Sequence, residues 1–346
     1  MHVYEIDPAT DERWDGFIQR HPQASVFHSA AWLEALRRTY GYRSFAVTTS
    51  PPGSALTNGI PFCEVKNFFW KPRLVSLPFS DHCQPLVQDP EELTHLLRYL
   101  RQKQEEERWQ YVEIRPVDTG AIAGTGFKQS QSFWFHKLDL CCSPGDLFHQ
   151  FHHDCVQRKI RRADRERLRY EEGTSESLLE RFYRLLLMTR RRHGIPTQPI
   201  KWFRNLITCL GTKVNIALAS KDEQPIASIL TLRHKCTVVY KYGCSDRKFN
   251  VLGGMQFLLW QTIQKAVEDQ LWEFDLGRSD RDNPGLVVFK DRWGAAQSEL
   301  TYLRCGQNSS RPLAKVGQTS ISKYLWAHAP DSMLSAASRA LYRHLG

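Results

Sequence analysis

The amino-acid sequence predicts a mixed α/β protein with two domains. Apolar residues recur at helical spacing in several segments, and these segments alternate with short runs rich in β-branched and aromatic residues. A chain of 346 residues is also long enough to bury two hydrophobic cores of ordinary size. We therefore expect an N-terminal domain at residues 1–140, a second domain at 141–305 and a C-terminal tail at 306–346 that contains an amphipathic helix from Ser332 to Leu345.

Helices and strands alternate through the first domain. Ser29 is a typical N-cap residue for a helix on which Trp32 and Leu36 form an apolar stripe. This helix is expected to end at Gly41, and a second helix at 90–107 carries leucines on one face. Strands are expected at residues 45–49, 59–65, 74–77, 111–114 and 133–138.

The second domain opens with helices and continues with a three-stranded meander. Gly253 and Gly254 then stand directly before a helix on which Phe257 and Trp260 share a face. A glycine turn before a helix exposes backbone N–H groups at the positive end of the helix dipole, which suits a pyrophosphate. The same two glycines also fit a simple turn or close packing. The helices are expected at 145–153, 155–170, 177–191 and 200–210, and the strands at 214–219, 226–232 and 238–242.

The composition is that of a folded protein, with 41% hydrophobic and 24% charged residues. No apolar run approaches the roughly 18 residues that a membrane-spanning helix needs, and the first residues do not resemble a signal peptide, so a cytoplasmic location is expected. Nine cysteines without a C-x-x-C pair predict reduced thiols and no metal site. The net charge of +10 indicates an anionic partner, such as nucleic acid, a nucleotide, a phosphorylated lipid intermediate or a membrane surface.

Arginine is concentrated on two helices of the second domain. Seven Lys or Arg residues between Cys155 and Tyr170, Arg158 among them, face two acids, and a further run covers residues 190–192. Such a helix face is either an ordinary solvated surface or a site for tRNA, a nucleotide diphosphate or an anionic lipid. Charge alone does not choose between these interpretations.

The stretch at 272–303 carries the candidate catalytic residues. A strand at 272–276 leads into a polar loop that contains Arg278, and Asp275 lies near its end. These charges form either a solvated ion-paired loop or a grip for a phosphate or carboxylate. Lys290 follows Phe289 on a short apolar turn, where it is either a surface lysine or a cation that stabilises negative charge developing in a reaction.

A polar loop in the first domain is a second candidate. Asp81 and His82 follow the strand at 74–77, and a loop there is able to present both side chains to a cleft between the domains. The alternative is that Asp81 is a turn residue and His82 its solvated neighbour.

Several runs of residues resemble one known family. FDLGRS, GLVVFKDRWG and LTYL in the second half, FHSAAWLEAL and SLPFSDHCQPLV in the first, and the closing ALYRHLG are similar to FemAB-like proteins of the GNAT acyltransferase superfamily. The resemblance spans nearly the whole chain. The glycine turn departs from the usual superfamily pattern, because counting from Asn250 gives Gly253 at the third place but Met255 at the fifth.

The resemblance implies two tandem GNAT-like domains, each a mixed, mostly antiparallel sheet flanked by helices. It implies a bacterial enzyme that moves an acyl or aminoacyl group onto an amine of a cell-envelope acceptor, in peptidoglycan or exopolysaccharide biosynthesis, either in the cytoplasm or at the inner face of an anionic membrane. Acyl-CoA or aminoacyl-tRNA would be the co-substrate, with no tightly bound cofactor. The rival hypothesis is a non-catalytic binding protein for an anionic glycolipid or nucleotide-sugar precursor.

The resemblance also assigns roles to residues. Two copies of one fold, each with its own sheet, would divide the work, because the corresponding helix of the first domain starts from Asp89 and Pro90, which disfavour a pyrophosphate. The second domain would therefore hold the donor and the first would shape the acceptor side. The expected catalytic residues are Lys290, Asp275 and Arg278, the donor contacts are Tyr242, Gly253, Gly254 and Phe289, and the acceptor contacts are Trp32, Asp81, His82 and Arg158.

Overall fold

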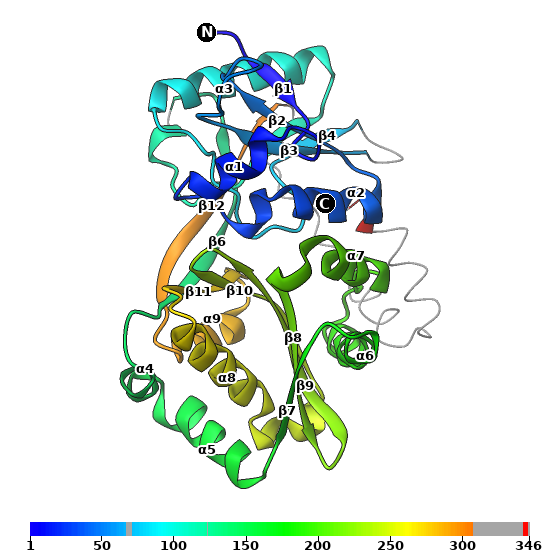
Figure 1. The fold of residues 1–346 in the computed structure, drawn as a ribbon, viewed down its shortest axis with the longest axis vertical. Helices are drawn as coiled ribbons and strands as arrows, with labels where there is room; N and C mark the ends of the chain where they lie inside the picture. Colours follow the sequence, from blue (N-terminus) through cyan, green and yellow to red (C-terminus); the bar gives the residue numbers. More distant parts are fainter. Residues whose placement is uncertain (67–70, 123, 307–341, 345–346) are drawn as a thin grey trace. The chain divides into compact units, whose positions relative to one another are not determined.

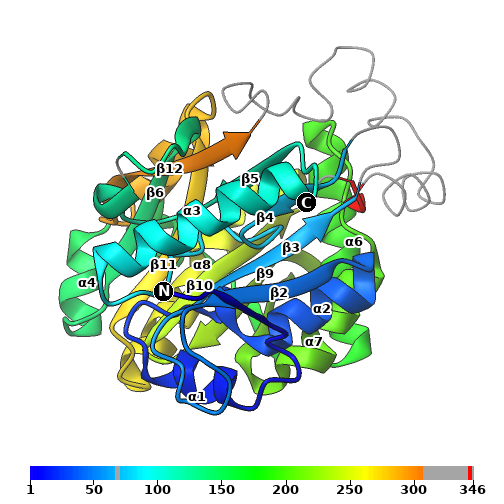
Figure 2. The ribbon, with the colours of Figure 1, turned by 90° about the horizontal axis from the view of Figure 1, so that it is seen from above.

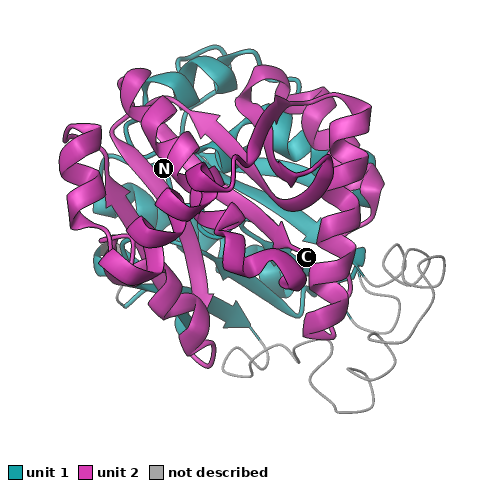
Figure 3. Cartoon of the chain, turned by 90° about the horizontal axis from the view of Figure 1, so that it is seen from below, with its two compact units in different colours: residues 1–133, 299–313, 339–346 teal, residues 134–298, 314–338 magenta. Residues whose placement is uncertain are grey.

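The computed structural model describes residues 1–66, 71–122, 124–306 and 342–344 (Figure 1). The chain forms two compact units, coloured separately in Figure 3. Among the described residues, unit 1 holds those up to Phe133 and those from Glu299 onward, and unit 2 holds Trp134–Ser298. The expected tail and its helix at 332–345 lie outside the described residues, apart from 342–344. No helix in the described part of the chain has the length and apolar character needed to cross a membrane.

Unit 1 confirms the predicted alternation of helices and strands. Ser29 caps α2 as predicted, since its Oγ accepts a hydrogen bond from the Trp32 backbone N–H at 3.3 Å, and Gly41 ends the helix in the left-handed conformation. The elements are β1 (Tyr4–Ile6), α1 (Arg13–Arg20), α2 (Ala30–Tyr40), β2 (Arg43–Thr48), β3 (Ile60–Val65), β4 (Arg73–Val75), α3 (Pro90–Glu106) and β5 (Tyr111–Ile114), with short 3₁₀ turns at Val26–His28 and Gly120–Ile122.

The sheet of unit 1 is an antiparallel meander followed by one parallel pair. Strands β1 to β4 pair antiparallel in sequence order, and β5 then pairs parallel to β4. The connection between these two parallel strands is α3, which runs across them in Figure 2 and packs its leucines against Leu74 and Val112. The next strand is β12 (Ala296–Gly306), which pairs antiparallel with β5 from Leu303 onward.

Unit 2 contains the predicted meander and most of the predicted helices. One expectation is wrong: the helix at 155–170 ends at Arg165, because Arg167 has a φ of 53° and the chain turns there into an edge strand that pairs with β8. The elements are α4 (Pro144–Gln150), a π-helical turn η3 (His153–Gln157), α5 (Arg158–Arg165), β7 (Arg169–Gly173), α6 (Glu176–His193), α7 (Ile200–Leu210), η4 (Gly211–Lys213), β8 (Val214–Lys221), β9 (Gln224–His234), β10 (Thr237–Ser245), η5 (Arg247–Leu252), α8 (Gly254–Glu268), β11 (Glu273–Asp280) and α9 (Pro284–Asp291).

The sheet of unit 2 repeats the topology of unit 1. Strands β7 to β10 pair antiparallel in sequence order, α8 follows the fourth of them, and β11 pairs parallel to β10. Helix α8 packs on one face of this sheet, with Phe257, Leu258 and Ile263 in the core, while α6 and α7 lie on the other face (Figure 1). The predicted repeat of one α/β fold is therefore present, with one helix after the fourth strand in each copy.

Two strands belong to both units and change the predicted boundaries. Strand β6 (Lys128–Asp139) begins in unit 1 and continues in unit 2, and β12 runs the opposite way, so the units divide at 133/134 and 298/299 rather than at 140 and 305. Through these strands the hydrogen-bonded order is continuous in the described residues, β1-β2-β3-β4-β5-β12-β6-β11-β10-β9-β8-β7. The expectation of one separate sheet per domain is wrong on this point.

Candidate functional site

Strands β10 and β11 part from each other in unit 2. Their parallel register holds three pairs, the last of which is Val239↔Asp275, although β10 continues to Ser245 and β11 to Asp280. Beyond this pair β10 remains hydrogen-bonded to β9, with a register shift between Tyr240 and Tyr242. Beyond Val239 the edge of β10 that faces away from β9 therefore has no register partner on β11, and an opening between two strands suits an extended ligand.

The glycine pair predicted to hold an anion forms the start of α8. Gly253 has a φ of +79°, and a Cβ atom there would lie 2.4 Å from the backbone oxygen of Lys159 on α5. A Cβ atom on Gly254 would lie 3.1 Å from the Ala227 Cβ atom on β9. Close packing therefore requires both glycines. The packing holds the first turn of α8 against α5 and β9.

A cavity of about 260 Å³ lies at this first turn of α8. Its wall includes Gly254 and Phe289, two of the residues predicted to contact the donor. The free N–H groups of a helix's first turn and the helix dipole both favour an anion at such a place. The lining residues are Lys159, Ile226, Ala227, Ser245, Phe249, Asn250, Gly254, Met255, Gln256 and Phe289.

Cations of three elements either line this cavity or lie next in sequence or in contact with residues that line it. Lys159 lines it, and Arg192 at the end of α6 donates to the backbone oxygen of the lining residue Ser245 at 3.3 Å. Arg190 lies two residues before Arg192, in the same last turn of α6. Arg247 and Lys248 belong to η5, which follows Ser245 in the chain. None of these five cations forms an ion pair with any described residue. We call Lys159, Arg190, Arg192, Arg247 and Lys248 the cation ring.

The surroundings of the cation ring are electropositive. The pKa of His193 is lowered, first by burial and then by the charges of Arg192 and Arg190. Asp246 is the acid within this segment, but it is buried and its carboxylate accepts the Lys248 backbone N–H at 3.0 Å. The cavity therefore combines a mixed polar and apolar lining with an excess of positive charge nearby, which suits a ligand that carries both phosphates and an apolar arm.

The three predicted catalytic residues meet at one point of β11. Asp275 accepts the Gly277 backbone N–H through Oδ1 at 2.7 Å, and Lys290 Nζ donates to the backbone oxygens of Gly277 and Arg278, both at 2.9 Å. Lys290 is 2% exposed and Asp275 1% exposed, which excludes the surface-lysine interpretation. Lys290 thus ties α9 to β11 just beyond the point where β10 and β11 separate. Its predicted action on a reacting carbonyl stays a prediction.

A second polar pair, which the sequence analysis does not predict, lies near Lys290. His136 on β6 is fully buried, and its Nε2 lies 3.0 Å from Asp291 Oδ1 on α9. Its pKa is lowered, first by burial and then by the charge of Lys290. The local sequence FWFHKL does not single out His136, and its partner becomes apparent only when α9 is placed against β6.

Two residues predicted to bind substrate lie away from the cavity. Tyr242 is buried on the α7 side of the sheet, where its hydroxyl accepts hydrogen bonds from Gln198 Nε2 at 2.8 Å and Trp202 Nε1 at 2.9 Å. Arg158 is exposed on α5 and pairs with Asp154 at 2.9 Å, one turn earlier. Neither residue lines the cavity. Their proposed contacts with donor and acceptor remain predictions.

The predicted acceptor residues of unit 1 are brought together around one aromatic ring. Trp32 and His82 are both buried and both approach Phe27 edge-on, with ring centroids 5.0 Å and 5.3 Å away. The backbone oxygen of Asp81 accepts the Tyr302 hydroxyl at 2.6 Å. Trp32 is a core residue, so its contribution to an acceptor site would be indirect.

The loop that carries Asp81 and His82 is held in an uncommon conformation. Leu77 and Phe79 both have a φ of 61°, which costs non-glycine residues free energy. The buried guanidinium of Arg115 holds this loop by donating to the backbone oxygens of Leu77 at 2.9 Å and Ser80 at 3.1 Å. Such strain is concentrated at functional sites, which keeps the loop a candidate for acceptor binding.

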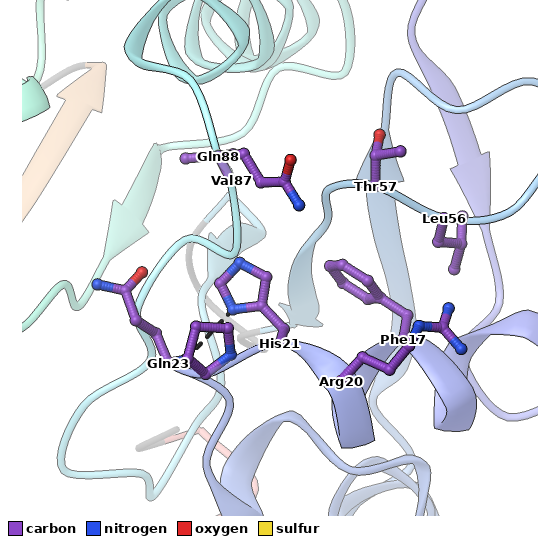
Figure 4. Close-up of a pocket in the computed structure, with 9 residues that line it drawn as sticks. Phe17, Arg20, His21, Gln23, Leu56, Thr57, Val87 and Gln88 are labelled. Atoms are coloured by element: carbon purple, nitrogen blue, oxygen red, sulfur yellow. Dashed lines mark hydrogen bonds between the residues drawn. The ribbon is translucent and has the colours of Figure 1, made fainter.

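Unit 1 also has a cavity before the helix that follows its fourth strand (Figure 4). Its volume is about 340 Å³, and the residues that line it come from the end of α1, the β2–β3 connection and the residues before α3. His21 and Gln88 face it, together with the apolar Phe17 (Figure 4). Arg20 is the one Lys or Arg among the lining residues. Among the described residues, no group of three His, Cys, Asp or Glu side chains is placed to hold a metal ion in either unit.

Comparison with known proteins identifies a GNAT domain within unit 2. The model of the acetyltransferase (GNAT) domain matches residues 152–290, which contain the parting strands, α8 and Lys290. The crystal structure of FemX superposes with a TM-score of 0.72 at 16% identity, over 89% of this chain and 98% of that one. Residues 152–290 thus match the GNAT acetyltransferase domain, and at 16% identity FemX shows a shared fold alone. The predicted GNAT superfamily is confirmed for this part of the chain, and the predicted fold class is confirmed.

Two further structures share the fold of this chain. L-PGS from Bacillus licheniformis has a TM-score of 0.58 at 12% identity, over 98% of this chain and 99% of that one. A tandem GNAT protein from the clavulanic acid biosynthesis pathway has a TM-score of 0.56 at 10% identity, over 88% and 98%. At these identities the likeness shows the fold alone. A search of curated proteins finds no match to the sequence.

Proposed function

We propose that this protein transfers an acyl group from acyl-CoA to an amine. The observation that carries the proposal is the cavity at the first turn of α8, with its unpaired cation ring and the open edge of β10 beside it. The phosphates of coenzyme A would bind to the helix N-terminus and the cation ring. Its pantetheine arm would extend along β10 toward the point where β11 departs.

The choice of acyl-CoA over aminoacyl-tRNA rests on two observations. The matching family model describes an acetyltransferase domain. The unpaired cations gather at one cavity, whereas Arg158 and Arg162 on the outer face of α5 are already engaged by Asp154 and Glu166. A small polyphosphate fits this distribution better than an RNA backbone, which requires an extended basic surface.

The transfer itself needs mainly positioning and charge stabilisation. The amine nitrogen attacks the thioester carbonyl carbon, a C–N bond forms, the C–S bond breaks, and the proton lost by the amine compensates the departing thiolate. Lys290 on α9 is proposed to stabilise the negative charge that develops in this step, close to β11, where its ammonium donates to the Gly277 and Arg278 carbonyls. Asp275 holds the same segment through the Gly277 N–H. Arg278 is proposed to grip an anionic group of a substrate.

The acceptor is proposed to be an amine of a cell-envelope or exopolysaccharide precursor, met in the cytoplasm or at the inner face of the membrane. The similarity of the motifs to FemAB-like proteins supports this choice, and the strained loop around Asp81 and His82 is the proposed contact in unit 1. A non-catalytic protein that holds an anionic glycolipid or a nucleotide-sugar is the alternative, because a phosphate-bearing ligand of either kind also suits the cation ring.

Isothermal titration with coenzyme A tests the donor site. Replacing Lys159, Arg247 and Lys248 together by Ala should weaken binding by about tenfold or more and reduce its dependence on salt. Arg204→Ala is the matched control, because Arg204 is an exposed cation of unit 2 that pairs with Glu176. Equal affinity in the triple variant and in wild type would place the donor elsewhere.

A transfer assay separates the enzyme from the binding protein. Thiol release from acetyl-CoA in the presence of a panel of amines should exceed the rate without an amine. Coenzyme A binding without any transfer to the panel, together with tighter binding of a nucleotide-sugar, would favour the non-catalytic alternative.

A further inference from the structure

We infer that His136 is a positioning residue for Lys290, because its hydrogen bond to Asp291 fixes the end of α9 and with it the lysine ammonium. The inference rests on the proposed acyl transfer, in which Lys290 stabilises negative charge. His136 lies on β6, which neighbours β11 in the sheet, and Asp291 directly follows Lys290 at the end of α9. Two consecutive residues of the helix therefore bind two neighbouring strands, Lys290 at β11 and Asp291 at β6.

Helix α9 buries little of its own surface. Of its eight residues, all of which the structure describes, Lys290 alone is buried, and Phe289 packs on the core of unit 2 while only partly buried. A helix of this length is not stable without contacts to the rest of the protein. The hydrogen bonds that its last two residues make to β11 and β6 therefore contribute to fixing its position.

Packing alone does not account for a histidine at position 136. The side chain is fully buried, and its Nδ1 has no hydrogen-bond partner among the described residues. A phenyl ring would fill similar space without burying an unpaired nitrogen, which costs free energy. What the histidine adds is the contact of Nε2 with Asp291 Oδ1 at 3.0 Å.

The chemistry of this contact suits a fixed anchor. The pKa of His136 is lowered, first by burial and then by the charge of Lys290, so the ring is neutral near neutral pH. The contact with a carboxylate then assigns the ring hydrogen to Nε2, which donates to Asp291. A hydrogen bond to an ionised acceptor is stronger than one between neutral groups.

Loss of this bond would act on the reaction through Lys290. The Asp291 side chain is 43% exposed, so without its partner it turns into solvent, and the end of α9 loses its contact with β6. The neighbouring Lys290 is then held less firmly. In a reaction that depends on positioning, a displacement of about 1 Å costs up to about a hundredfold in rate.

The test is steady-state kinetics with acetyl-CoA and an amine that the protein acetylates. His136→Phe keeps the ring but removes both nitrogens, and it should lower kcat about tenfold while KM for acetyl-CoA stays within about twofold. His136→Gln has an amide N–H that reaches about as far as Nε2 and should recover kcat to within about threefold of wild type. In the Lys290→Met background, His136→Phe should change kcat by less than about twofold, because no ammonium is left to position.

Two further variants control for a general loss of structure. His234→Phe is the matched control, because His234 is another buried histidine in the sheet of unit 2 and lies on β9; it should leave kcat unchanged. Asp291→Ala breaks the same bond from its more exposed end and should lower kcat as His136→Phe does. Circular dichroism identifies a variant that does not fold, and Asp291→Ala decides if His136→Phe is such a variant.

The outcomes separate this inference from the proposed function. Wild-type kcat in His136→Phe and Asp291→Ala would overturn the inference and leave the proposed transfer intact. An equal loss from His136→Phe with and without the Lys290 ammonium would do the same, because a purely structural role predicts it. Absence of transfer from acetyl-CoA to any amine in wild type would overturn the proposed function and this inference with it.

Discussion

The two units share one topology, and they differ most where the helix after the fourth strand begins. In unit 1, α3 starts with Pro90, Glu91 and Glu92 behind the cap Asp89, whose carboxylate accepts the Glu91 backbone N–H at 2.9 Å. In unit 2, α8 starts at Gly254 with no side-chain cap, and the cation ring surrounds its first turn. Both units have a cavity beside this position.

The difference shows how one fold provides two different binding surfaces. Asp89 and Pro90 occupy or remove N–H donors of α3, and the adjacent acids repel an anion. Gly253 and Gly254 leave the N–H groups of α8 uncapped and let α5 and β9 approach closely. On this comparison the helix start of unit 2 suits a polyphosphate and that of unit 1 does not. The division of donor and acceptor roles between the two domains stays a prediction.

Substitution of Gly253 should have the largest effect on stability. It disrupts the close packing of the glycine start of α8 against α5, which the start of α3 in unit 1 lacks. In Gly253→Ala a methyl group would meet the Lys159 backbone oxygen in a left-handed residue, and we expect a loss of about 2–5 kcal/mol in the free energy of unfolding. Gly41→Ala in unit 1 is the matched control, with a φ of +73° and nothing within 4 Å, and should cost about 1–2 kcal/mol. Urea denaturation measures both. Equal losses would show that the contact with α5 is not tight.

Removal of the Lys290 ammonium tests the proposed catalytic role of the buried contact between α9 and β11 in unit 2. Lys290→Ala should slow acyl transfer about a hundredfold, or about 2.7 kcal/mol in the activation barrier. It should also lower stability, because the Gly277 and Arg278 carbonyls lose a buried donor. Lys290→Met separates the effect on the transfer rate from the effect on stability, because methionine keeps most of the apolar packing of the side chain but lacks the charge. Transfer at the wild-type rate in Lys290→Ala would remove the residue from the mechanism.

Acid should weaken unit 2 through His234. Burial, followed by the charges of Lys213 and Lys235, lowers the pKa of this histidine to about 4 from 6.5. The folded state therefore binds fewer protons than the unfolded state, so the stability is full above pH 6.5 and is lost as the pH falls toward 4. The loss should reach about 2 kcal/mol at pH 5. His234→Phe should flatten the dependence of the unfolding free energy on pH between 6.5 and 5, and an unchanged slope would assign it to other groups.

A smaller effect is expected at the start of α3 in unit 1. Glu91→Gln removes a favourable charge from the first turn and should cost about 0.5 kcal/mol at low salt. It should not create a binding site for coenzyme A, because the Asp89 cap and Pro90 remain. Tight coenzyme A binding at α3 in this variant would mean that a single charge, rather than the whole architecture of the helix start, separates the two units.

Much of the fold follows from local sequence patterns. The Ser29 cap, the Gly41 stop, the meander of unit 2 and the glycine turn before α8 were all predicted correctly, because each depends on residues close together in the chain. Strand β7 was missed, since the arginine-rich segment before it is helical and the turn at Arg167 has no glycine or proline to mark it. The membership of β12 in unit 1 was missed because its partner, β5, is distant in sequence.

The candidate site was predictable only in part. Gly254, Phe289 and Lys290 were identified from local motifs, but the cation ring joins residues of α5, α6 and η5, which only the tertiary structure brings together. The burial of Lys290 and the pairing of His136 with Asp291 likewise depend on how α9 packs on the sheet.

Hydrogen–deuterium exchange with and without coenzyme A tests the central claim most directly, because it reports on both helix starts in one experiment. The account predicts that coenzyme A slows exchange at residues 245–256, which include the end of β10, η5 and the first turn of α8, and leaves residues 87–93 at the start of α3 unchanged. Protection at 87–93, or binding of coenzyme A without protection at 245–256, would contradict it.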